Sequence, residues 1–239
     1  MRKPWHSLAA VVGTLTLTLA APLTAQATVF GSNLIVNGDA ETAPGDPGGN
    51  VVPVPGFTIT GQLTAVTYDA PGGFPLASDP GPASRGLNFF AGGPSAAASS
   101  GWQSIDLSSG AGVIDAGGAS FDLSAYLGGF SSQGDNARLT VTFLDGASAV
   151  LGSATIGPVS PADRAGATGL LWQETTGSVP VNTRSATIEL LLTRTDGSYN
   201  DGYADNLSLV ISAVPEPSEA LLLSIGGLAL VGWRRQNRG

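Results

Sequence analysis

Arg138-Leu139-Thr140-Val141-Thr142-Phe143 alternates strictly between polar and apolar side chains. Successive side chains of a β-strand point to opposite faces, so this stretch predicts a half-buried strand with one face on a core. The stretches at 187–190 and 206–209 alternate in the same way. About ten such segments, separated by Gly, Pro, Asp or Asn turns, follow one another and indicate an all-β protein.

No linker divides these segments, and no stretch between residues 28 and 213 has a helical period. We therefore predict one domain at 28–213, a single antiparallel β-sandwich of the jelly-roll type. Stretches rich in small residues, Gly and Pro predict long loops at one end of the sandwich, at Ala43–Gly49 and Ala70–Pro82, and a further flexible loop at Ala91–Ser100.

The composition limits how this domain is stabilised. The 239 residues include 34 Gly and 16 Pro, and 42% are hydrophobic, which is enough for a core. There is no cysteine, so disulfides, thiolate metal sites and a cysteine nucleophile are excluded. Stability must come from the β core.

The domain is strongly acidic. Residues 28–213 contain five arginines, no lysine and sixteen Asp and Glu residues. A protein that binds the phosphate backbone of DNA or RNA needs a basic face, and none is available here. Nucleic acid is therefore excluded as a partner.

Residues 1–27 have the features of a secretory signal peptide. Arg2 and Lys3 form a positive start, an apolar stretch follows at 8–21, and Ala25-Gln26-Ala27 is a cleavage site for signal peptidase. We predict a signal-peptide helix and export of the domain. The alternative, an uncleaved membrane anchor, is disfavoured because the apolar stretch is short and contains three threonines.

Residues 214–239 form a tail with a different composition. Val214-Pro215-Glu216-Pro217 precedes an apolar segment at 220–233, and Arg234 and Arg235 follow it. We predict a short hydrophobic helix here, because a full membrane span needs roughly 20 apolar residues. The alternative is a buried helix of the domain, but such a helix would be apolar on all sides and would end in an arginine cluster.

This tail resembles the PEP-CTERM sorting signal of Gram-negative, biofilm-forming bacteria, on the Val-Pro-Glu-Pro motif, the short apolar segment and the terminal arginines. The resemblance implies that an exosortase recognises and removes the tail. It also implies transient anchoring at the inner membrane, followed by a place at the cell surface or in the extracellular matrix.

Asn33–Glu41 (NLIVNGDAE) and Gly202–Ile211 (GYADNLSLVI) resemble the terminal strands of galactose-binding-like jelly rolls, the fold of many carbohydrate-binding modules. The resemblance implies a structural Ca²⁺ between the first and last strands, with Glu41 and Asp205 as ligands and Asp39 and Asp201 nearby. Oxygen ligands suit Ca²⁺. The alternative is ordinary turn chemistry, since Asp and Asn at strand ends cap turns.

Two aromatic residues are candidates for stacking on a sugar ring. Strict alternation places Trp102 on the polar face of its strand with Ser104 and Asp106, and places Tyr126 on the face of Asp122. An exposed aromatic ring beside polar groups suits a sugar. The alternative is that loops cover these rings or that a β-bulge resets the register.

Catalysis has few candidate residues. The only histidine is His6, so residues 28–213 contain no His, Lys or Cys. This excludes Ser-His-Asp and Cys-His arrangements and a Schiff-base lysine, and only a two-carboxylate glycosidase remains. Within the domain the glutamates are Glu41, Glu174 and Glu189, with Glu174 in a turn-like stretch.

The sequence thus predicts a non-enzymatic, exported protein at the cell surface or in the matrix. The first hypothesis is a module that binds carbohydrate, such as exopolysaccharide. The alternatives are a structural matrix protein without a specific ligand and a carboxylate-based glycan hydrolase.

Overall fold

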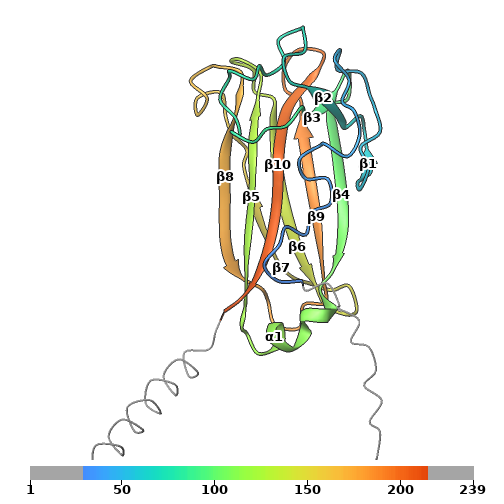
Figure 1. Ribbon diagram of the computed structural model, residues 1–239, viewed down its shortest axis with the longest axis vertical. Helices are drawn as coiled ribbons and strands as arrows, with labels where there is room; N and C mark the ends of the chain where they lie inside the picture. Colours follow the sequence, from blue (N-terminus) through green and yellow to red (C-terminus); the bar gives the residue numbers. More distant parts are fainter. Residues whose placement is uncertain (1–28, 215–239) are drawn as a thin grey trace, which may run out of the picture.

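Two five-stranded antiparallel sheets face each other in the computed structural model, which describes residues 29–214 (Figure 1). A 3-10 turn at Ser108–Gly110 and the short helix α1, Ala111–Asp115, lie at one end of the sandwich. The strands are β1 (Thr58–Thr60), β2 (Thr64–Thr67), β3 (Asn88–Gly93), β4 (Ala98–Asp106), β5 (Ala119–Gly129), β6 (Asn136–Leu144), β7 (Val150–Ile156), β8 (Gly169–Ser178), β9 (Ser185–Thr193) and β10 (Asn200–Ala213).

The strand order is that of a jelly roll. Sheet I has the order β2-β3-β10-β5-β8, and sheet II has the order β1-β4-β9-β6-β7. Strands β3 to β10 therefore form one long ribbon that folds back between β6 and β7, so that β5 pairs with β8, β4 with β9 and β3 with β10. The wrapped ribbon, extended by β1 and β2 at the sheet edges, confirms the predicted all-β jelly roll.

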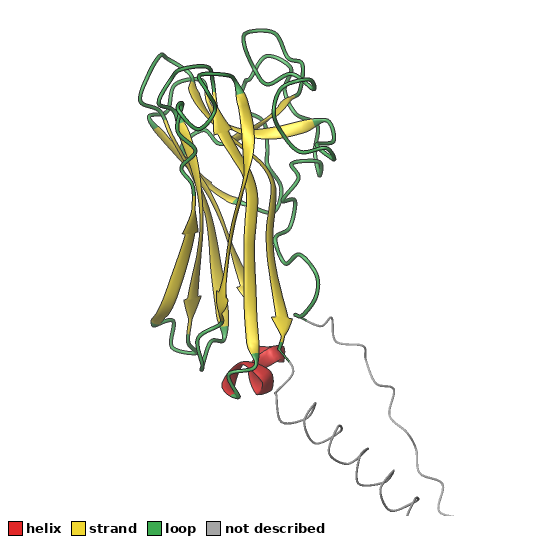
Figure 2. Ribbon diagram, turned by 90° about the vertical axis from the view of Figure 1, so that its left-hand side faces the viewer, coloured by secondary structure: helices red, strands yellow, loops and turns green. Residues whose placement is uncertain are grey.

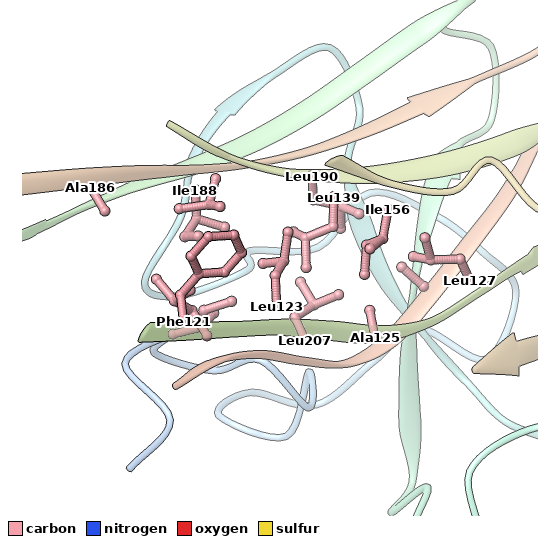
Figure 3. Packing of buried hydrophobic residues seen from close by; sticks show 14 of the residues in the cluster. Phe121, Leu123, Ala125, Leu127, Leu139, Ile156, Ala186, Ile188, Leu190 and Leu207 are labelled. Atoms are coloured by element: carbon pink, nitrogen blue, oxygen red, sulfur yellow. The ribbon is translucent and has the colours of Figure 1, made fainter. Parts of the chain in front are cut away.

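The alternation seen in the sequence builds the core between the sheets. On β6, the side chains of Leu139, Val141 and Phe143 are buried, while Arg138 is exposed. Figure 3 shows apolar side chains from the two sheets pointing toward one another across this space; they include Phe121, Leu123, Ala125, Leu127, Leu139, Ile188 and Leu190.

The beginning and the end of the domain lie side by side. The main chain at Gly31 and Leu34 donates to the carbonyls of Ile211 and Leu209 on β10. The side chain of Asn33 continues this pairing, donating to the Leu207 carbonyl at 2.9 Å and accepting from the Leu209 N–H at 3.0 Å. The two terminal segments that resemble jelly-roll strands are thus neighbours.

Besides the core between the sheets, a second cluster of buried side chains covers part of the outer face of sheet I; because it is rich in aromatic residues, we call it the second aromatic cluster. Phe89 and Tyr203 are fully buried there, with ring centroids 5.2 Å apart in an edge-to-face arrangement. Tyr68 and Phe74, from the loop after β2, pack against Phe89 at 5.0 and 6.2 Å. One end of this face is therefore buried, although it lies outside the sandwich core.

The predicted loops at Ala43–Gly49 and Ala70–Pro82 contain no strand, and long loops gather at the end of the sandwich opposite α1 (Figures 1 and 2). The predicted flexible loop at Ala91–Ser100 is wrong. Its two ends belong to β3, which is buried throughout, and to β4, so only residues 94–97 form a loop. The small residues there reflect close packing: a Cβ on Gly92 would lie 2.1 Å from the Asn200 side chain.

The predicted sorting elements fall mostly outside the described residues. The signal peptide at 1–27 and the tail residues Pro215, Glu216, Pro217, Arg234 and Arg235 all lie beyond them. Val214 is the last described residue; it is half-exposed, and its N–H donates to the Gly118 carbonyl at 2.7 Å. Between residues 29 and 214, no helix has the length and apolar character needed to cross a membrane.

Candidate carbohydrate-binding face

An exposed aromatic pair lies on the outer face of sheet I. Tyr126 on β5 lies directly opposite Trp172 on β8, and their ring centroids are 5.2 Å apart at an interplanar angle of 61°. Trp172 is 45% exposed, and its indole N–H donates to Glu174 Oε2 at 3.1 Å. Tyr126 packs against the second aromatic cluster on its other side. The pair is therefore held in place while presenting the Trp172 ring to solvent.

A β-bulge shapes the neighbouring part of β10. Asp205 pairs with Tyr126, but the next paired residue is Ser208, opposite Ser124, so β10 has one extra residue here. Asn206 occupies the bulge with a φ of 50°, a left-handed conformation that Asn tolerates better than most residues. Bulges often redirect a side chain at a functional site.

The bulge, Trp172 and the first segment of the domain line a hollow of about 370 Å³. Gly38 allows the main chain to approach β10 closely, since a Cβ there would lie 2.2 Å from the Leu207 carbonyl oxygen. The lining provides one aromatic face, two amides, a carboxylate and two hydroxyls; its residues are Asn33, Gly38, Asp39, Ser124, Trp172, Asn206, Leu207 and Ser208. Such a combination suits a ligand with an apolar ring face and several hydroxyl groups.

Trp102 lies far from this hollow in the fold, on the outer face of sheet II. It is 42% exposed on β4, between the cross-strand neighbours Thr58 and Glu189. The structure therefore does not bring Trp102 and Tyr126 together, because the two sheets of the sandwich separate them. Stacking by Trp102 stays a prediction for another surface.

From the sequence, Trp172 is a weaker stacking candidate than Trp102 and Tyr126 and is not among the predicted binding residues. The burial of its strand alternates in the structure, but the sequence at 170–178 (LLWQETTGS) does not alternate between apolar and polar residues as the strand of Tyr126 does. Reading Glu174 as part of a turn hid this strand, and that reading is wrong because β8 extends to Ser178.

Asp205 is a fully buried carboxyl on β10. Its Oδ2 accepts from the Tyr68 hydroxyl at 2.7 Å, and its Oδ1 accepts from the Asn206 N–H at 2.7 Å. Burial raises the pKa of Asp205 to about 8, and the nearby carboxylates of Glu41 and Asp39 add to the rise. The two hydrogen bonds oppose this shift without cancelling it.

Glu41 holds the start of β3. Its Oε1 accepts from the N–H groups of Leu87 and Asn88, both at 2.7 Å, and its Oε2 accepts from the Asn88 side chain at 3.3 Å. Glu41 also lines a separate hollow of about 420 Å³ with Tyr68 and Asn88.

These contacts bear on the calcium implied by the resemblance. Every carboxylate oxygen of Glu41 and Asp205 accepts a hydrogen bond from an N–H or O–H group. These donors carry partial positive charge and cannot themselves be ligands of a cation. Asp201 is engaged elsewhere, accepting from the Tyr203 hydroxyl at 2.6 Å. Among residues 29–214, no group of three or more Asp, Glu, His or Cys side chains is arranged for a metal. A structural Ca²⁺ with Glu41 and Asp205 as ligands stays a prediction of the resemblance.

Two carboxylates share a third hollow of about 480 Å³, formed by the loop after β2. Asp69 accepts from the Ala77 N–H and Asp79 from the Leu76 N–H, each at 2.8 Å. Both carboxylates thus fold the loop on which they lie.

Comparison with known proteins gives the fold a context. No protein-family model matches the chain, and no curated protein matches it closely enough to be a relative. Among solved structures, a cyclase from Fischerella sp. TAU in complex with 4-(1H-indol-3-yl)butan-2-one is 14% identical, with a TM-score of 0.50, and the match covers 77% of this chain and 98% of the cyclase. At this identity the likeness shows the fold alone.

Two further matches have lower TM-scores. A family 16 carbohydrate-binding module-2 is 20% identical over 74% of this chain and 99% of that chain, with a TM-score of 0.46. The enzymatically active domain of bacteriophage CBA120 tailspike protein 4 is 16% identical with a TM-score of 0.46; 75% of this chain matches only 21% of the tailspike. The function of this chain must be argued from its site.

Proposed function

We propose that this protein is a non-enzymatic, exported carbohydrate-binding module that binds polysaccharide on the outer face of sheet I. The observation that carries the proposal is the exposed Trp172 ring, which packs on the half-buried Tyr126 and lines a polar hollow of about 370 Å³. A sugar ring stacks through its apolar C–H face on an aromatic ring and uses its hydroxyls for hydrogen bonds. Trp172 supplies the first contact, and Asp39, Asn206 and Ser208 supply the second.

The rest of the domain is consistent with binding without catalysis. Residues 28–213 contain no His, Lys or Cys that could serve as a nucleophile or base. Asp39 is the one carboxylate that lines this hollow, whereas glycoside hydrolysis uses a pair.

The two ends of the sequence support the location in this proposal. A signal peptide at 1–27 directs export, and the PEP-CTERM-like tail from Val214 holds the protein at the inner membrane until an exosortase removes it. The domain then acts at the cell surface or in the extracellular matrix, where polysaccharide is available.

The test compares two exposed tryptophans on opposite faces. Binding of the full chain to a panel of exopolysaccharides is measured by affinity electrophoresis for the wild type, Trp172→Ala and Trp102→Ala. Removing a central aromatic contact costs about 2 kcal/mol, so Trp172→Ala is expected to weaken binding by roughly 30-fold. Trp102→Ala removes an equally exposed ring and should bind like the wild type.

Unchanged binding by Trp172→Ala would overturn the proposed site. Loss confined to Trp102→Ala would move the site to sheet II. If the wild type binds no glycan in the panel, the structural matrix protein becomes the better hypothesis.

A further inference from the structure

We propose that a second copy of this chain pairs with the open edge of β8, joining two copies of sheet I into one continuous ten-stranded sheet. β8 lies at the end of sheet I and pairs with β5 along ten consecutive residues without a register shift. Among the described residues, no strand lies along its other edge. A long, regular and open edge is a template for another strand.

Two hydrogen bonds show which main-chain groups face the open edge. The Leu170 N–H donates to the Pro80 carbonyl at 2.8 Å, and the Trp172 carbonyl accepts from the Gln173 side chain at 2.7 Å. Neither partner belongs to β5. Because N–H and C=O groups alternate in direction along an antiparallel strand, the groups of Glu174, Thr176 and Ser178 also point outward. In the described part of the chain, none of them has a main-chain partner on that side.

The edge lacks the features that usually prevent such pairing. Natural edge strands are protected by proline, lysine, bulges or short length. β8 has ten residues, with neither Pro nor Lys among them, and Glu174 is its one charged residue. The loop at Pro80 covers only the first residues of the strand, so the second half is accessible.

Charge and the loop at Pro80 select the register of the pairing. Two antiparallel copies of β8 can place Glu174 opposite its own counterpart, which brings two like charges together and is unfavourable. A shift of two residues in one direction would place Thr176 opposite Leu170, whose N–H already donates to the Pro80 carbonyl, so the shift in the other direction is favoured. That shift places Glu174 opposite Thr176 of the second copy and Trp172 opposite Ser178. The twofold axis then passes through Thr175, and no like charges meet directly.

This dimer has a consequence for the binding face. Both Tyr126–Trp172 pairs lie on the same outer face of the joined sheet, so one polysaccharide chain contacts both. Two linked sites bind more tightly than one, because the second contact is intramolecular. The gain in affinity rests on the proposed function, whereas the pairing of β8 does not.

The absence of native cysteine allows a clean cross-linking test. Thr175 and its counterpart form a non-hydrogen-bonded pair at the axis, with Cα atoms about 4.5 Å apart, within reach of a disulfide. The full chain carrying Thr175→Cys is therefore expected to form a covalent dimer in a glutathione redox buffer. Gln173→Cys is the matched control on the same face, because it lies about 13 Å along the strand from its own counterpart.

A second variant removes the pairing without cross-linking chemistry. Thr176→Pro deletes an N–H that faces the open edge and leaves the β5–β8 ladder intact, so the domain should unfold like the wild type. Sedimentation velocity is expected to show a dimer for the wild type and a monomer for Thr176→Pro. A monomeric wild type, or equal cross-linking by Thr175→Cys and Gln173→Cys, would overturn the proposal.

The two proposals fail separately in these experiments. Trp172→Ala should weaken sugar binding by roughly 30-fold and keep the dimer, because it leaves the main-chain groups of the β8 edge unchanged. Thr176→Pro should abolish the dimer and keep the weaker binding of a single site.

Discussion

The outer faces of the two sheets are built from similar strands but present different surfaces. On sheet II the outward residues are mainly Ser and Thr and stay open to solvent, with Thr140 and Thr155 sharing a hydrogen bond of 2.9 Å. On sheet I one end is buried under the second aromatic cluster, and the Tyr126–Trp172 pair lies beside a hollow. The difference comes from outward aromatic residues on the strands of sheet I together with the segments that cross this sheet, and it shows how loops and strands jointly turn one face of a sandwich into a site.

The largest effect should come from breaking the second aromatic cluster. Phe89 is fully buried between Tyr68 and Tyr203, so Phe89→Ala leaves a cavity and is expected to lower the free energy of unfolding by about 3–5 kcal/mol. Ser104→Ala, an exposed position on sheet II, should change it by less than about 0.5 kcal/mol. Urea unfolding measures both. Similar values for the two variants would show that the cluster adds no stability.

The pH dependence of stability should expose the buried Asp205. Its pKa of about 8 lies above the ordinary value of 3.8, so between these values the folded state keeps a proton that the unfolded chain releases. Stability therefore falls as the pH rises through this window, by at most about 1.4 kcal/mol per pH unit, and levels off above it.

Urea midpoints between pH 5 and 8 give this slope. Asp205→Asn cannot ionise and should flatten it, whereas Glu189→Gln, at an exposed position on sheet II, should keep the wild-type slope. A wild type that is equally stable at pH 5 and pH 8 would contradict the raised pKa.

The smallest effect concerns the orientation of the Trp172 ring. Glu174 accepts the indole N–H at 3.1 Å on the solvent-exposed face, and a hydrogen bond to a charged acceptor there is worth about 1 kcal/mol. Glu174→Ala is expected to weaken polysaccharide binding by roughly fivefold, measured by isothermal titration calorimetry. Glu189→Ala removes a carboxylate beside Trp102 on the other face and should leave the affinity unchanged. Equal losses would mean that bulk charge matters, not ring orientation.

Much of the fold follows from local patterns. Alternation of the kind seen at Leu139, Val141 and Phe143 predicts strands and their buried faces, and turn residues mark where the strands end. The same patterns fail at Ala91–Ser100, because small residues that pack closely against Asn200 look like residues of a flexible loop. Glu174 was misread for a related reason: Thr and Gly beside it are common in turns, and its place on β8 depends on pairing with β5.

The candidate site was only half predictable. The sequence places Tyr126 on the polar side of a strand, but the residues around Trp172 do not alternate between apolar and polar. Tyr126 and Trp172 are neighbours because β5 pairs with β8 across more than forty residues of sequence. Strand pairing also places Trp102 on the other sheet. The alternation of residues within one strand does not reveal which strands pair.

The sequence by itself determined the strand period, the all-β class and the acidic and cysteine-free character of the domain, because each of these is a property of neighbouring residues or of composition. The two terminal sorting signals stay predictions of the sequence. The tertiary structure alone decided that Asn33 continues a sheet with β10, that Asp205 is buried beneath Tyr68 and that Trp172 joins Tyr126. These contacts form only when the strands assemble into the jelly roll. The free energy that favours this topology comes from many contacts throughout the core, not from any single segment.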